Sequence, residues 1–169
     1  GPPADPAPVA AAASGPLGDE ARAVVTELLP TGPWTWKDPR LCLTLPFWRA
    51  VLDDVPPAVV CLRNPLEIAA SLQRRNGFAT GYGLALWERY LRSLWPELAG
   101  RPVLVVDYDD VLAQPASVVD ALAGFVADHT GVGPTDEQRT AATASLDEDE
   151  RHHEADDDAL ERDPAVSAE

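Results

Sequence analysis

Apolar positions along the chain recur at two spacings, which predict helices and strands in alternation. The clearest helical stripe predicts an amphipathic helix over residues 82–98 and consists of Leu84, Trp87, Leu91, Leu94, Trp95 and Leu98. Apolar runs within 58–63 and 102–107, which end in Arg63 and Asp107, predict two strands buried on both faces. Weaker patterns predict a short strand-like piece at 34–37 and helices at 21–29, 43–52, 65–75 and 118–126. Strands that alternate with helices predict an α/β fold, with a parallel sheet between two layers of helices.

The junction after the first of these strands has the features of an anion site. Arg63 ends the strand, Asn64 is a good N-cap and Pro65 takes the first helical position. Glu67 completes an N-cap/N3 capping box. The helix then presents N–H groups and the positive end of its dipole beside the Arg63 guanidinium, and Ser71 adds a hydroxyl. Taken alone, an ordinary strand–helix turn with a surface arginine explains the segment equally well.

Lys37 is the only lysine in a chain that has twelve arginines. A compact ammonium at a strand end can follow a phosphate or sulfate oxygen as charge develops on it. The alternative is a surface lysine paired with Asp38 or Asp109. Because ligands of parallel sheets bind beyond the carboxyl ends of the strands, we expect Lys37, Arg63 and Asp107 to face one crevice.

Acidic residues are concentrated near the C-terminus. The chain has 169 residues and a net charge of −15, of which one base and four acids in residues 1–33 contribute −3. Nine bases and eleven acids give −2 over 34–128, and three bases and thirteen acids give −10 over 129–169. We therefore expect no nucleic-acid binding, whereas a local anion site in the nearly neutral middle remains compatible with the charge.

Composition divides the chain into three parts. We expect a disordered Pro/Ala-rich arm at 1–16, a partial α/β domain at 17–130, and an acidic tail at 131–169 that is partly helical or disordered. No membrane-span or signal-peptide pattern is present, so we expect a cytoplasmic chain without a membrane partner. Cys42 and Cys61 are expected to be buried free thiols, although a disulfide between them is possible.

Some other features argue against a metal or catalytic site, or indicate an incomplete protein. The pair His152-His153 lies among acids without a third metal ligand, which favours a solvated tail over a metal site. Asp107 to Asp110 is expected to cap the next helix. The chain contains no methionine and opens in the Pro/Ala-rich stretch, so we expect a partial sequence.

Three segments together resemble the sulfotransferases that use 3′-phosphoadenosine 5′-phosphosulfate, most closely the bacterial members. They are WTWKDPR (34–40), CLRNPLEIAASLQRRNGF (61–78) and VDYDDVLAQP (106–115). The resemblance covers roughly residues 34–128 and implies a P-loop-like three-layer sulfotransferase fold.

In that family an arginine at a strand end and a serine eight residues later hold the 3′-phosphate of the cofactor, which implies this role for Arg63 and Ser71. A lysine at another strand end touches the transferred sulfuryl group or the bridging oxygen, which implies a catalytic role for Lys37. The resemblance also implies a small-molecule or glycan acceptor. It names neither the acceptor nor the oligomeric state.

The chain departs from the family pattern in two places. Residues 1–33 contain no strand followed by the glycine-rich loop that holds the 5′-phosphosulfate in the family. The histidine that some members carry two residues after the lysine is replaced by Pro39, so Asp38 is a weak substitute for the base. Arg151 in the tail is a poor candidate for a further phosphate contact.

Two functional hypotheses follow, from different classes. The first is the C-terminal portion of a sulfotransferase that transfers a sulfuryl group to a hydroxyl or amine, although this chain alone can be inactive. The alternative is a non-catalytic sulfotransferase-like remnant that acts as an interaction module through its acidic tail. A sugar or nucleoside kinase relative ranks last, because the chain has no glycine-rich loop or catalytic carboxylate motif.

Overall fold

The computed structural model describes residues 5–28, 34–52, 56–146, 159 and 162. The chain divides into two compact units, and each is described by itself. Unit 1 comprises Gly1–Pro57 and Glu88–Pro102, and unit 2 comprises Ala58–Trp87 and Val103–Glu169. Helix α5 (Thr80–Leu98) contributes its first part to unit 2 and its second part to unit 1.

The expected three-layer parallel sheet is wrong for the described residues. They are 72% helical, and their sheet has two strands, β1 (Ala58–Leu62) and β2 (Val103–Asp107). The strands pair in parallel, as predicted, with Leu62 opposite Asp107. Residues 34–38 form no strand, and the predicted strand-like piece there is absent from the structure.

The two strands are not buried on both faces, contrary to the prediction. Paired residues of a parallel sheet point to the same face, so Val60 lies beside Val105 and Cys61 beside Val106. Val60 and Val106 are buried, whereas Val105 is 47% exposed and Cys61 is exposed. On the face that contains Val60, β1 is therefore buried and β2 is exposed. On the face that contains Val106, β2 is buried and β1 is exposed.

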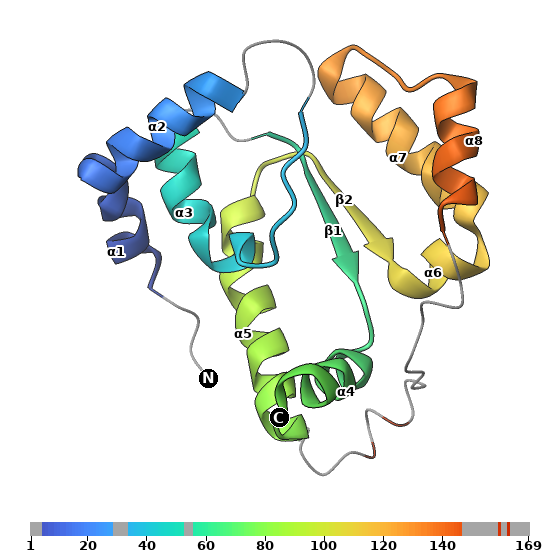
Figure 1. The fold of residues 1–169 in the computed structure, drawn as a ribbon, viewed down its shortest axis with the longest axis horizontal. Helices are drawn as coiled ribbons and strands as arrows, with labels where there is room; N and C mark the ends of the chain where they lie inside the picture. Colours follow the sequence, from blue (N-terminus) through green and yellow to red (C-terminus); the bar gives the residue numbers. More distant parts are fainter. Residues whose placement is uncertain (1–4, 29–33, 53–55, 147–158, 160–161, 163–169) are drawn as a thin grey trace. The chain divides into compact units, whose positions relative to one another are not determined.

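Helices complete unit 2. They are α4 (Pro65–Asn76), the first part of α5, α6 (Tyr108–Ala113), α7 (Pro115–Thr130) and α8 (Asp136–Ala144). Figure 1 shows β1 and β2 side by side, with α6 directly after β2 and with α7 beside α8. Helix α7 also contacts β2. Helix α8 begins with a Thr135/Gln138 capping box.

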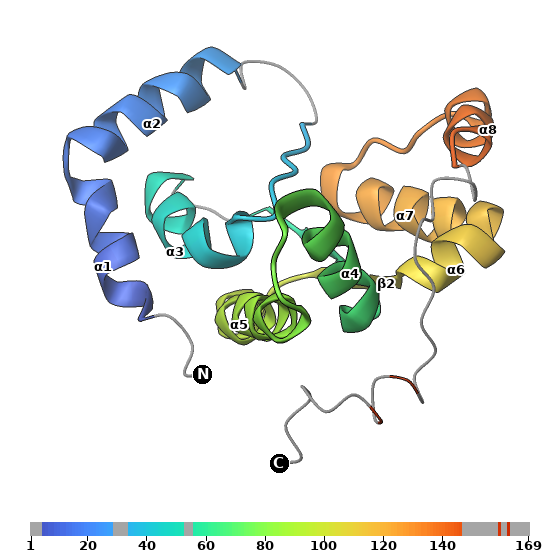
Figure 2. The same cartoon turned by 60° about the horizontal axis from the view of Figure 1, so that its bottom comes forward.

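The core of unit 1 is built by the helices of the first third of the chain. They are α1 (Pro6–Ala11), the 3-10 turn η1 (Ala12–Ser14), α2 (Pro16–Leu28) and α3 (Leu41–Leu52). Helices α1 and α2 both pack on α3 (Figure 2). The buried cluster consists of Ala13, Ala21, Phe47 and Val51, with Val9, Val25 and Trp48 packed against it.

Residues expected to form a disordered arm take part in this core. Asp5 caps α1 by accepting a hydrogen bond from the Ala7 N–H, and Pro6 starts the helix. Alanine has the highest helix propensity, so the same composition that suggested a linker also supports a short helix once Ala13 is buried. Beyond Leu146 the predicted acidic tail lies outside the described residues, except for Ala159 and Arg162.

Candidate functional site: the Arg63 junction

The predicted Asn64 cap forms in the turn between β1 and α4, and the predicted capping box through Glu67 stays a prediction. Strand β1 ends at Leu62, and the Asn64 side chain accepts a hydrogen bond from the Leu66 N–H at 2.9 Å. Pro65 is the first helical residue, where its missing N–H costs nothing. Asn64 is therefore the N-cap of α4, and Arg63 lies between the strand and the positive end of the helix dipole.

Among the described residues of unit 2, Glu67 and Tyr108 lie close to the Arg63 guanidinium. Its Nε donates to Oε2 of Glu67 at 2.8 Å, and its Cζ lies 4.3 Å from the centre of the Tyr108 ring. Glu67 is only 1% exposed, whereas the Arg63 side chain is 23% exposed. The candidate anion site thus contains a buried carboxylate as well as an arginine.

Strand register brings Tyr108 to Arg63. Leu62 and Asp107 are partners across the sheet, so the residues that follow them, Arg63 and Tyr108, leave it at the same end. The Asp107 carboxylate accepts from the Asp109 N–H at 2.8 Å and caps α6. The predicted capping role of this acidic segment is confirmed.

Ser71 lies on α4, one helical turn beyond Glu67, and is exposed. Residues four apart share one face of a helix, so Glu67 and Ser71 lie on the same side of α4. The structure thus gives Ser71 a solvent-facing position on the face that begins at the junction. Its role in holding a phosphate stays a prediction.

Lys37 belongs to unit 1 and is exposed, in a segment without helix or strand. Its neighbour Trp36 contacts Trp48 edge-on, with ring centroids 4.1 Å apart. The expected approach of Lys37 to Arg63 and Asp107 in one crevice stays a prediction, because only Arg63 and Asp107 belong to the same unit.

Asp38, the one substitute base near Lys37, is held by Arg40. Its carboxylate accepts from the Arg40 Nε at 2.9 Å and from the Arg40 backbone N–H at 2.8 Å. The side-chain hydrogen bond is the main cause that lowers the pKa of Asp38 to about 2. A carboxylate with so low a pKa is a poor proton acceptor at neutral pH.

The cysteines differ from the prediction in burial but not in redox state. Both are free, Cys42 is partly buried and Cys61 is exposed. Although the residue is exposed, partial removal of its sulfur from water raises the pKa of the Cys61 thiol, and the nearby Asp107 raises this pKa further. Neither feature favours a reactive thiolate.

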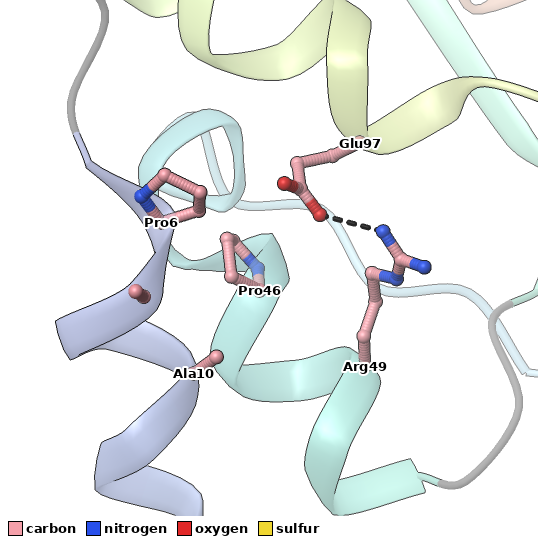
Figure 3. A pocket seen from close by; sticks show the side chains of 6 residues that line it. Pro6, Ala10, Pro46, Arg49 and Glu97 are labelled. Atoms are coloured by element: carbon pink, nitrogen blue, oxygen red, sulfur yellow. Dashed lines mark hydrogen bonds and ion pairs between the residues drawn. The ribbon is translucent and has the colours of Figure 1, made fainter.

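An open pocket of about 220 Å³ lies in unit 1, and none of the predicted site residues lines it (Figure 3). Pro6, Ala7, Ala10 and Pro46 line it, together with Arg49 and Glu97. Arg49 and Glu97 form an ion pair, with Nη1 2.7 Å from Oε2. This pair gives the pocket a polar side, but its remaining lining offers no hydrogen-bonding side chain.

Sequence reasoning missed Glu67 and Tyr108 as neighbours of Arg63. The opposite charges of Arg63 and Glu67 and their short separation in the sequence were a usable signal for this pairing. Among the described residues no group of three or more potential metal ligands is present, and no helix is long and apolar enough to cross a membrane. His152, His153 and Arg151 lie outside those residues.

Comparison with known proteins identifies no relative. No family model, no curated protein and no solved structure matches the chain.

Proposed function

We propose that residues 34–128 contribute the 3′-phosphate side of a nucleotide site in a sulfotransferase that uses 3′-phosphoadenosine 5′-phosphosulfate. One observation carries this proposal: Arg63 stands at the carboxyl end of a parallel strand, directly before a capped helix N-terminus. Such a position favours a bound anion through the helix dipole and through charge-assisted hydrogen bonds. The resemblance of the three segments supplies the identity of the nucleotide.

In the proposed reaction the sulfur–oxygen bond to the 5′-phosphate breaks, and a new bond forms to a hydroxyl or amine of a small molecule or glycan. The proton of the acceptor passes to a base that the chain's pattern does not name. By resemblance, Lys37 stabilises the charge that develops on the leaving phosphate oxygen. Loss of one such donor typically lowers a rate about 100- to 1000-fold.

Calorimetry with adenosine 3′,5′-bisphosphate and the full chain tests the proposal. We expect binding that weakens about 10- to 150-fold in the double variant Arg63→Ala/Ser71→Ala, since a hydrogen bond to a charged group is worth about 1.5–3 kcal/mol. Arg92→Ala is the matched control, because Arg92 also pairs with a glutamate four residues away, at 2.8 Å, on α5. Equal affinity of the full chain and the double variant would refute the assignment of Arg63 and Ser71.

A second candidate is a non-catalytic interaction module that binds a basic partner through the acidic C-terminal residues. The ion pair with Glu67 favours it, because a buried carboxylate already balances the charge of Arg63. The charge of −10 over residues 129–169 supplies the attraction. Absence of nucleotide binding in the same calorimetry would favour this candidate.

A further inference from the structure

The burial of Glu67 sets its ion pair with Arg63 apart from an ordinary surface salt bridge. Glu67 is an ionisable residue near the start of α4, yet its side chain is fully buried. A buried carboxylate is kept only where it is paired and hydrogen-bonded, because burial removes its hydration. Arg63 Nε supplies such a partner at 2.8 Å.

A second Arg–Glu pair, with both residues inside α5, has the same sequence spacing and the same N–O distance without the burial. Arg92 Nε lies 2.8 Å from Oε1 of Glu88, again four residues apart, but these side chains are 55% and 39% exposed. An Arg–Glu pair on a helix therefore does not need to be buried to form. Burial of Glu67 fixes the position of its carboxylate. The exposed carboxylate of Glu88 is not restricted in this way.

Two contacts restrict the Arg63 guanidinium in different directions. The Glu67 carboxylate accepts from its Nε, and its Cζ lies over the Tyr108 ring, 4.3 Å from the ring centre. A planar guanidinium held by both contacts has a restricted orientation. A guanidinium with a restricted orientation can donate two parallel hydrogen bonds to a phosphate. The flexible ammonium of a lysine cannot reproduce this arrangement.

We propose that Glu67 is a positioning residue that sets the guanidinium of Arg63 for recognition of a nucleotide 3′-phosphate. This inference rests on the proposed function. Glu67 itself does not touch the nucleotide and acts through Arg63. Its carboxylate oxygen is needed as a hydrogen-bond acceptor for Nε, whereas its negative charge is not.

The readout is the preference for the 3′-phosphate, which a general loss of stability would not change selectively. It is the ratio of the Kd of adenosine 5′-monophosphate to that of adenosine 3′,5′-bisphosphate, measured by calorimetry on the full chain. Glu67→Met fills the space but removes the acceptor, and we expect the ratio to fall about tenfold or more. Glu67→Gln keeps a neutral acceptor, so its ratio should stay within about threefold of the unmutated chain.

Arg63→Lys provides a second test if Glu67→Met fails to fold. A single ammonium cannot keep the buried Glu67 contact and bind the phosphate as a fork, so the ratio should again fall about tenfold. Glu88→Met, in the exposed pair, is the matched control and should leave the ratio unchanged.

The outcomes separate this inference from the proposed function. If the unmutated chain binds both nucleotides equally, the proposed function fails. If it prefers the bisphosphate but Arg63→Lys and a folded Glu67→Met keep that preference, only the positioning role is overturned. Loss of the preference in Glu67→Gln as well would show that charge, and not position, is what Glu67 supplies.

Discussion

Asp38 and Glu67 are both held by an arginine, but they differ in burial. Glu67 is fully buried, whereas the Asp38 side chain, in the segment before α3 of unit 1, is 25% exposed. The pKa of Asp38 is lowered from 3.8 to about 2, first by the side-chain hydrogen bond from Arg40 and then by the Arg40 backbone N–H. A lowered pKa favours the folded state above the ordinary pKa, and this contribution is lost as the pH falls toward 2.

Replacing Arg40 should therefore raise the titration midpoint of Asp38. In Arg40→Gln the backbone N–H still donates, so we expect the pKa to rise from about 2 toward 3.8 without reaching it. Carboxyl carbon NMR of the full chain across the acid range measures the midpoint. Arg49→Gln, which removes an arginine bound to Glu97, serves as the control. A midpoint that stays near 2 in Arg40→Gln would contradict the assigned cause.

Local signals at single residues were predictable, but partners were not. Asn64, Pro65 and the C-cap Gly77 mark the ends of α4, and each acts within a few residues of its own position. Glu67 was predicted to complete a capping box with Asn64, and in the structure it pairs with Arg63, four residues before it. The other partner of Arg63, Tyr108, lies far away in the sequence and was not predictable from local signals.

The helices and strands themselves were predictable from local sequence patterns, whereas their arrangement depends on contacts between distant segments. The helical stripe at 82–98 became α5 (Thr80–Leu98), and both apolar runs became strands. The number of strands in the sheet and the coverage of its faces were not predictable, because both depend on which segments meet. Val59 is 48% exposed although it stands in an unbroken apolar run.

Helices α4 and α5 meet at a point where only glycine fits. A Cβ on Gly83 would lie 2.8 Å from the Ala69 Cα, and Ala69 is fully buried. We expect Gly83→Ala to lower the free energy of unfolding by about 1–3 kcal/mol, because backbone of α4 must shift. Urea unfolding measures the change.

Gly124 on α7 is the matched control for this substitution. A Cβ there would meet no atom within 4 Å, so Gly124→Ala should raise the free energy of unfolding by about 0.5–1 kcal/mol through helix propensity. Equal effects of the two substitutions would show that α4 and α5 do not pack at Ala69.

At the scale of the whole molecule, charge is distributed very unevenly. Residues 147–169 contain eleven acids and two arginines, a net of −9, so residues 1–146 carry −6 of the total −15. Attraction of this strength over 23 residues would act on any basic partner and would weaken as salt screens it.

Removal of residues 147–169 tests the second candidate function. The full chain should bind an oligolysine peptide at low salt, with an affinity that falls as salt increases, and the shortened chain should lose most of this binding. Fluorescence anisotropy of a labelled peptide measures both. Truncation there leaves α8 intact, and a variant with Gln and Asn in place of the acids controls for length. Unchanged peptide binding after truncation would exclude the tail as the binding segment.

The connection between β2 and α6 contains no loop at all. Asp107 is both the last residue of the strand and the cap of the helix, and Tyr108 is the first helical residue. Sliding of β2 along β1 by one residue would therefore carry the aromatic ring away from Arg63 in the same movement. A one-residue insertion after Val106 would shift Asp107 and Tyr108 relative to β1. It would therefore disrupt the pairing of Asp107 with Leu62 and the contact of Tyr108 with Arg63 at the same time.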